Sequence, residues 1–322
     1  MPMQDMMGGF FGLELPTYGN FPYVEGSCSL FTNSGRAAFE CLLRNMPVPE
    51  TLWVPFFICD TVLEAPERLG IRVQRYSCTH QLQPELPPVG AHDLVLLVNY
   101  FGLTETHLRD AVTKLPGQCI VDSTTALYNP PLPGVPTFYS PRKFCGVADG
   151  GVATAPFPLV WKPEQLSCSA TESLFLLERI ESGSIAALPG SESAEQALHS
   201  PPQCMSRLTR KLLSSINFDS AASQRLQNYG TLHRALGSIN RLYLPNTPMH
   251  APMCYPLICG IPELRECLID AGIALPLFWA EVIEHMSPDS AEYQIASRLL
   301  PLPLDQRYNQ ADMEHIIELI LS

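Results

Sequence analysis

The sequence predicts an α/β fold in which a mostly parallel sheet is sandwiched by helices, followed by a smaller C-terminal α+β domain. Segments typical of strands and of helices alternate through the first half of the 322-residue chain, which is the pattern of βαβ units. The run DLVLLVN at residues 93–99 is apolar without alternation, as in strands that are covered on both faces. Beyond Gly151 the chain changes to long helical stretches and irregular connections.

Local patterns predict each element of the first half. In residues 33–44 a loop opens into a helix, because the small and apolar residues between Ala37 and Leu42 recur at helical spacing and Ser34 can cap the first turn. Apolar runs predict strands at 52–57, 72–76, 93–99 and 118–122, and helical periodicity predicts helices at 60–69 (despite Pro66) and at 105–114.

The second half begins with a helix expected at residues 163–180. Residues 181–203 are rich in Ser, Gly, Pro and Ala, which predicts a flexible connection or a mobile lid. A long helical stretch at 205–236, interrupted near Asn217, leads to the C-terminal unit, on which an amphipathic helix at 310–321 docks. We therefore expect a large domain at 1–236 and a small domain at 237–322.

The composition excludes several classes of protein. Hydrophobic residues make up 46% and charged residues 16% of the chain, which is typical of a globular protein with a large core. The net charge of −12 argues against nucleic acid as the main partner, because phosphate backbones select basic surfaces. No apolar run approaches the roughly 20 residues that span a bilayer, and the first residues lack the pattern of a secretion signal.

The 11 cysteines are scattered along the chain. Neither they nor the eight histidines have the spacing of a metal site. We expect most of the thiols to be reduced, small hydrophobic side chains of a cytoplasmic protein, with no metal.

Asp122 and Lys143 are the residues that indicate a chemistry. Asp122 ends a predicted strand, where ligands collect in parallel sheets, and Lys143 follows in a later loop. Pyridoxal phosphate requires these two groups: a lysine amine that forms a Schiff base with the aldehyde, and a carboxylate that keeps the ring nitrogen protonated. The alternative is that Lys143 is a solvated surface charge.

The residues around Lys143 favour the first interpretation. An amine among apolar neighbours is desolvated, which lowers its pKa and makes it nucleophilic. The neighbours in question are Tyr139, Phe144, Cys145 and Val147.

Several motifs in their order resemble the DegT/StrS-type sugar aminotransferases, which are pyridoxal-phosphate enzymes of the aspartate-aminotransferase fold (fold type I). The motifs are TNSGRAAFECLL, VPFFICDTVLEAPERLG, LLVNYFG, CIVDSTTA, SPRKFCGVADGG and LLPLPLDQRYNQADMEHI. Single pieces such as NSG or DGG are weak signals, whereas their order and spacing together are specific.

The resemblance implies roles for individual residues. Lys143 corresponds to the Schiff-base lysine, and Asp122 to the aspartate at the pyridine nitrogen. Gly35, Arg36 and Ala37 correspond to the turn whose backbone amides bind the cofactor phosphate, a role that free amides at a helix start can also fill on physical grounds. An ordinary capped helix start is the alternative for this turn.

Further roles follow with departures from the family pattern. Ser140 supplies a hydroxyl to the phosphate, although the family serine usually stands two residues earlier. Cys59 occupies the position of the aromatic residue that often stacks on the ring, and Thr125 the position of a Gln or His near the phenolic oxygen. The asparagine motif that usually reaches the neighbouring subunit's phosphate is replaced by PPQC at 201–204.

Three more residues are candidates for substrate contact. Asn99 and Tyr100 follow a predicted strand and are expected to face the site, with structural packing as the alternative for Tyr100. Arg142 is suited to a substrate carboxylate or phosphate, with a structural ion pair as the alternative.

The resemblance implies a homodimeric aminotransferase with a shared active site. Its amino donor would be an amino acid, glutamate by analogy, and its acceptor a keto-sugar, nucleotide-linked by analogy. One alternative is a catalytically degenerate protein that binds the cofactor and has a regulatory or structural role. Sugar dehydration is a third possibility, but the dehydratases of this type carry a histidine where this chain has Lys143.

Overall fold

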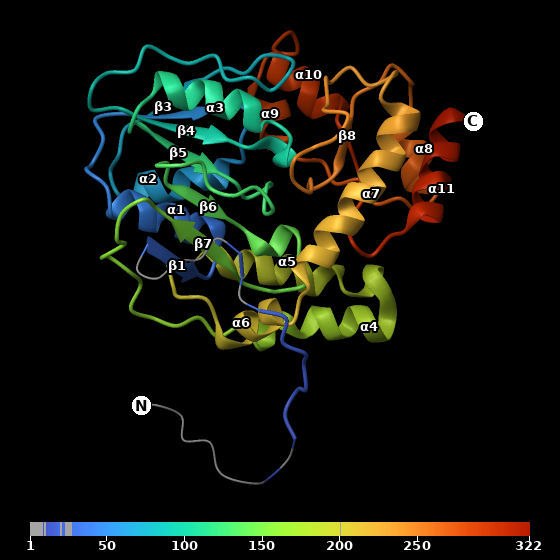
Figure 1. The fold of residues 1–322 in the computed structure, drawn as a ribbon, viewed down its shortest axis with the longest axis horizontal. Coiled ribbons are helices and arrows are strands. Elements are labelled where there is room, and N and C mark those ends of the chain that lie inside the picture. The colour runs from blue at the N-terminus through green and yellow to red at the C-terminus, as the bar shows by residue number, and fades with distance from the viewer. Residues whose placement is uncertain (1–8, 10, 20, 23–27, 200) are drawn as a thin grey trace.

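A seven-stranded sheet forms the centre of the computed structural model, which describes residues 9, 11–19, 21–22, 28–199 and 201–322 (Figure 1). The strand order is β1-β7-β6-β5-β4-β2-β3. The five strands from β6 to β3 in this order are parallel, whereas β7 is antiparallel to both β6 and β1. A second sheet contains only the antiparallel pair β8 and β9. The predicted fold class is confirmed.

The strands have the following bounds: β1 Ser29–Thr32, β2 Leu52–Pro55, β3 Val73–Tyr76, β4 Leu94–Val98, β5 Cys119–Asp122, β6 Thr137–Tyr139, β7 Gly151–Thr154, β8 Tyr255–Leu257 and β9 Leu300–Leu302. The α-helices are α1 Gly35–Arg44, α2 Glu64–Arg68, α3 Glu105–Lys114, α4 Leu174–Ala186, α5 Leu188–Gln196, α6 Arg207–Ser214, α7 Phe218–Leu236, α8 Leu264–Asp270, α9 Ala280–His285, α10 Ala291–Arg298 and α11 Gln310–Leu321. Short 3-10 helices are η2 Asp60–Leu63, η3 Tyr100–Gly102, η4 Pro141–Lys143, η5 Thr171–Ser173 and η6 Ala197–His199.

Every strand and helix predicted before residue 123 is present, with ends shifted by a few residues at most. The apolar run of β4 is buried at all five positions, and Ser34 caps α1 by accepting a hydrogen bond from the Ala37 N–H. The helical stretch that follows Met205 is interrupted as expected, because Asn217 caps a new helix, α7. The terminal helix α11 packs against α7 and α8 on the right of Figure 1.

The helix predicted at 163–180 is confirmed from residue 171 onward, as η5 and the first part of α4, and the mobility of residues 181–203 stays a prediction. Residues 163–170 are not helical, and the stretch expected to be a flexible connection is helical in α4, α5 and η6. Composition misled here because tertiary contacts override weak local propensity: Ala194 and Leu198 are buried, and Glu195 forms ion pairs with two arginines. Gly183 alone keeps a feature expected of a linker within α4: its φ of 86° interrupts the helix.

Within the described ranges, buried hydrophobic residues form three clusters. The first surrounds the parallel sheet, the second joins the end of α7 to β8, β9, α8 and α11, and the third lies between α6, α7 and strands β6 and β7. The first cluster also includes Val282, Ile295 and Leu299 from the C-terminal part of the chain. The division at residue 236 stays a proposal, and the first core crosses it.

The cysteines that lie in the core behave as small hydrophobic residues. Cys41, Cys78, Cys119 and Cys254 are buried, and all the cysteines are free thiols. Burial raises the pKa of Cys78 to about 12 and that of Cys119 to about 11, so these thiols are protonated near neutral pH. No helix in the described ranges has the length and apolar character needed to cross a membrane.

Strand β7 begins with Gly151 and is preceded by Gly150. Glycine is needed at this place because the backbone touches the turn that starts α1. The Gly150 N–H donates to the Asn33 carbonyl at 2.7 Å. A Cβ on Gly151 would overlap the carbonyl group of Ser34 and lie 2.7 Å from the Thr32 hydroxyl oxygen, so no side chain fits there. The DGG motif therefore brings two backbones into contact and fixes where α1 starts.

Asp149, which precedes the glycines, fastens the start of α6. Its buried carboxylate accepts hydrogen bonds from the Ser206 N–H at 2.9 Å, from the Ser206 hydroxyl at 2.8 Å and from the Thr209 hydroxyl. Ser206 is itself the cap of α6. Asp149 has a structural role here: it ties the sheet to the helix.

We expect Gly151→Ala to lower the free energy of unfolding by about 3 kcal/mol or more, because overpacking against rigid backbone cannot relax. Gly230→Ala is the matched control. Gly230 lies inside α7, and a Cβ added to it would have no neighbouring atom within 4 Å, so alanine there should stabilise by about 0.5 to 1 kcal/mol. Denaturant or thermal unfolding of both variants tests the pair, and equal effects would contradict the backbone contact.

Candidate functional site

Most of the residues predicted to form the site meet at the carboxyl ends of the parallel strands. A cavity of about 210 Å³ is lined by Ser34, Gly35, Arg36, Ile58, Cys59, Thr61, Val62, Val98, Asp122, Thr124, Thr125, Ser140, Arg142, Lys143, Glu195 and Trp279. This is the edge at which ligands bind in such sheets. A larger cavity of about 320 Å³ lies beside Glu105 and His250, but neither Asp122 nor Lys143 lines it, so we place the site in the smaller one.

Asp122 ends strand β5 and is 6% exposed. One carboxylate oxygen accepts a hydrogen bond from the Thr124 N–H at 2.7 Å. Burial raises the pKa of Asp122 above its ordinary value, while the Lys143 cation and the Thr124 hydrogen bonds act in the opposite direction. A further positive partner in the cavity would stabilise the ionised form of this buried acid.

Lys143 is the last residue of η4, and it is exposed. The expectation of a desolvated amine is therefore wrong. The apolar neighbours that motivated it, including Tyr139, Phe144 and Val147, pack instead into the third hydrophobic cluster. Lys143 nevertheless lines the same cavity as Asp122, as the chemistry requires.

Thr124 connects the two charged residues. Its backbone N–H donates to Asp122, and its hydroxyl accepts a hydrogen bond from Lys143 Nζ at 3.4 Å. Its neighbour Thr125 was the residue predicted from the sequence. The Thr125 hydroxyl donates to the Asn99 carbonyl at 2.9 Å and accepts from the Phe101 N–H at 3.2 Å, so it is engaged with the backbone although it lines the cavity.

The start of α1 forms one wall of the cavity. A Cβ on Gly35 would lie 3.0 Å from Thr124 Cγ2 and 3.4 Å from Ser140 Cβ, so glycine lets the first turn approach the ends of β5 and β6. Ala37 is buried and its N–H is bound by Ser34. Gly35 and Arg36 therefore line the cavity as predicted, and Ala37 does not.

Asn99 and Tyr100 do not line this cavity. Both are buried, and the Tyr100 hydroxyl donates to the Phe57 carbonyl at 2.7 Å. The structure favours packing for Tyr100, the alternative left open for it, and the expectation that Asn99 faces this cavity is wrong.

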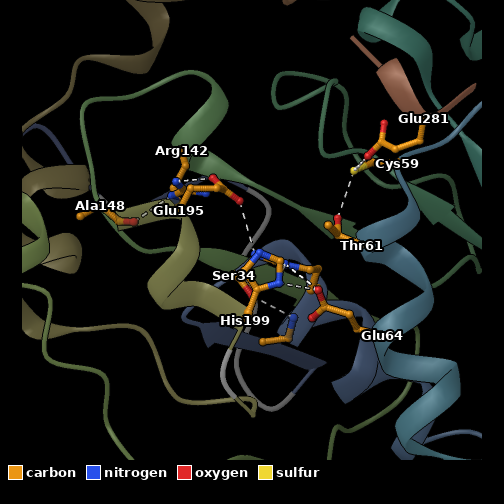
Figure 2. A network of polar contacts seen from close by, with 11 residues as sticks. Ser34, Cys59, Thr61, Glu64, Arg142, Ala148, Glu195, His199 and Glu281 are labelled. Carbon is orange, nitrogen blue, oxygen red and sulfur yellow. Dashed lines mark hydrogen bonds and ion pairs between the residues drawn. The ribbon is translucent and has the colours of Figure 1, made fainter. Parts of the chain in front are cut away.

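Cys59 lines the cavity beside a segment from the C-terminal part of the chain. Its thiol lies 3.2 Å from the Thr61 hydroxyl and donates to the Glu281 carboxylate at 3.2 Å (Figure 2). Burial raises the pKa of Cys59, with the Glu281 carboxylate acting in the same direction. Two residues before Glu281, Trp279 completes the lining.

A network of charges forms another part of the lining. Glu195 of α5 pairs with Arg142 at 2.7 Å and with Arg36 at 3.4 Å (Figure 2). Arg36 also pairs with Glu64 at 2.9 Å, and His199 lies 2.7 Å from the same carboxylate. Partial burial opposes ionisation of Glu195, but Arg142, Arg36 and Lys143 together hold its pKa below the usual value.

Arg142 thus has the ion pair that the sequence left open as an alternative to substrate binding. Its Nε also donates to the Ala148 carbonyl at 2.8 Å. Glu195, Trp279 and Thr124 are three of the lining residues that sequence reasoning did not assign to the site. The scarcity of tryptophan in the chain was a signal for Trp279, whereas nothing local marked Glu195.

The fold is that of solved sugar aminotransferases. The structure is similar to the sugar aminotransferase CalS13 from Micromonospora echinospora, with 16% sequence identity, a TM-score of 0.61, and coverage of 91% of this chain and 86% of that one. It is similar to a DegT/DnrJ/EryC1/StrS aminotransferase from Brucella abortus, with 13% identity, a TM-score of 0.59, and coverage of 91% and 84%.

The same fold occurs in Spr1654 from Streptococcus pneumoniae in its PLP form, with 15% identity, a TM-score of 0.58, and coverage of 90% of this chain and 85% of that one. No protein-family model and no curated protein sequence matches the chain. At these identities the likeness establishes the fold.

Glu195→Gln tests the contact between α5 and the cavity. The pKa of Glu195 in the folded chain is lower than its ordinary value of 4.5, so its ion pairs stabilise the fold above that pH and lose their effect as the pH falls through the lowered pKa. We expect the variant to melt at a lower temperature than the wild type at pH 7. The loss in the free energy of unfolding should be less than about 1 kcal/mol, because the carboxylate is half exposed.

The difference in melting temperature should shrink as the pH falls below 4.5, the ordinary pKa. Glu192→Gln, an exposed position on the same helix, serves as the control and should behave like the wild type. A pH-independent difference would contradict the role of the ion pairs.

Proposed function

We propose that the protein is a pyridoxal-phosphate-dependent aminotransferase of the DegT/StrS type. It transfers an amino group from an amino acid, glutamate by analogy, to a nucleotide-linked keto-sugar, and it acts as a homodimer with a shared active site. One observation carries the proposal: Asp122 and Lys143 line one cavity at the carboxyl ends of the strands, joined through Thr124. The order of the motifs in the sequence and the fold of the solved sugar aminotransferases support it.

The residues present fit pyridoxal phosphate. Gly35 leaves room for backbone beside Thr124 and Ser140, where any side chain would be crowded. The first turn of α1 offers N–H groups to a phosphate, and Arg36 and Ser140 lie at the same cavity. The buried carboxylate of Asp122 is suited to a protonated ring nitrogen, because that cation would relieve the desolvation of the acid.

Each residue then has a definite task. The cofactor, when bound, supplies an aldehyde for the substrate amine and a ring that takes up the electrons of the broken C–H bond. Lys143 would hold the cofactor through Nζ and, when its amine is free, would move a proton as general acid and base. Asp122 would keep the proton on the ring nitrogen. The exposure of Lys143 gives its amine the freedom that both tasks require.

The proposed substrates would enter next to the charge network. Arg142 and Arg36 are cations at the cavity that can bind the carboxylate of the donor or a phosphate of the acceptor. In this structure Glu195 forms ion pairs with both of them. An anionic substrate would therefore share or displace the Glu195 carboxylate.

Lys143→Ala should abolish the covalent bond between protein and cofactor. After borohydride reduction in the presence of pyridoxal phosphate, mass spectrometry of the wild type should find the cofactor on Lys143. The remaining lysines are Lys114, Lys162 and Lys211. A Lys162→Ala variant should keep both the adduct at Lys143 and the absorbance of the bound cofactor. An adduct spread evenly over the four lysines would contradict the proposal.

Asp122→Asn should keep the covalent adduct at Lys143 but slow amino transfer by at least about 100-fold, because a neutral amide does not stabilise charge on the ring nitrogen. The measurement is the absorbance change of the bound cofactor after addition of glutamate. Asp93→Asn is the control, because Asp93 binds Trp53 and Gly90 at the opposite end of strand β4. If the wild-type protein binds the cofactor but its absorbance does not change with any amino acid tested, the protein is instead catalytically idle.

A further inference from the structure

We propose that the indole of Trp279 packs against the heterocyclic ring of pyridoxal phosphate and forms the aromatic wall of its site. This inference rests on the proposed function. It assigns a cofactor contact to a residue of the C-terminal part of the chain, more than a hundred positions beyond Lys143 in the sequence.

The cavity wall offers a single aromatic surface. Among the described residues that line it, Trp279 alone is aromatic. From the segment after β2, the cavity is lined by Ile58, Cys59, Thr61 and Val62, none of which offers a flat surface to a planar ring. A protonated pyridine is a flat cation, and an indole face is the protein surface that attracts such a group most strongly.

The indole of Trp279 is held in place by other rings. Its ring centroid lies 4.4 Å from that of Phe57 and 5.6 Å from that of Phe101, and Tyr100 meets it edge-on at 5.8 Å. Tyr100 is in turn fixed by its hydrogen bond to the Phe57 carbonyl. The three rings follow the ends of β2 and β4, so the same strands that position the cavity also position Trp279.

The segment that carries Trp279 is anchored to the cavity wall. Glu281 accepts a hydrogen bond from the Cys59 thiol, which ties the start of α9 to that wall. Trp279 has a left-handed backbone with φ of 57°, a conformation that is uncommon for residues other than glycine and that clusters at functional sites. The segment is built to present one side chain to the cavity.

Tryptophan fluorescence tests whether Trp279 is the indole that lies nearest to the bound cofactor. The three tryptophans are Trp53, Trp161 and Trp279. Pyridoxal phosphate quenches the emission of a nearby indole, so titration of the wild type should lower the emission. Trp279→Phe should remove most of the quenched emission while keeping an aromatic ring in the packing. Trp53→Phe and Trp161→Phe are the matched controls and should retain the quenching.

A second measurement separates ring contact from a structural role. Trp279→Leu should bind pyridoxal phosphate about three- to tenfold more weakly, as expected for the loss of one aromatic contact. Inorganic phosphate, which lacks the ring, should compete with unchanged affinity. Melting curves of both variants confirm that they are folded.

Equal affinity of Trp279→Leu and wild type for pyridoxal phosphate would overturn the inference, as would a parallel loss of phosphate affinity. Full quenching in Trp279→Phe would overturn it as well. Each of these results leaves the adduct at Lys143, and hence the proposed function, intact. A wild type that shows neither quenching nor an adduct at Lys143 would instead remove the proposed function and this inference with it.

Discussion

The contact between the start of β7 and the turn before α1 is the constraint on which the site depends. Because Gly151 has no side chain, the Ser34 carbonyl can approach its backbone closely. This contact carries the first turn of α1 to the ends of β5 and β6, where Gly35 meets Thr124 and Ser140. The free amides of a helix start, a buried acid and a lysine are brought to one cavity by a contact between two backbones.

Electrostatics within that cavity are nearly balanced by the chain itself. The protein carries a net charge of −12, yet three cations, Arg36, Arg142 and Lys143, line one small volume. Glu195 forms ion pairs with the two arginines, and Asp122 interacts electrostatically with Lys143. Since Glu195 is contributed by α5, the local positive potential available to an anion depends on where that helix lies.

Much of this arrangement was predictable from the sequence, for identifiable reasons. Asp122 and the cap at Ser34 sit at the ends of strongly patterned elements, where local signals are reliable. The exposure of Lys143 was not predictable, because residues that are adjacent in sequence need not lie on the same side of the chain as the lysine. Glu195 and Trp279 were missed because they reach the cavity through tertiary contacts from segments far away in the chain.

The crossing of the first hydrophobic cluster over residue 236 has a consequence for how the chain can be divided. Val282, Ile295 and Leu299 bury surface of the same core that surrounds the sheet. A protease or a truncation that removed them would leave apolar surface of the sheet open to water and to aggregation. The two parts therefore gain stability together, and a fragment that ends with α7 is not a self-sufficient half of the molecule.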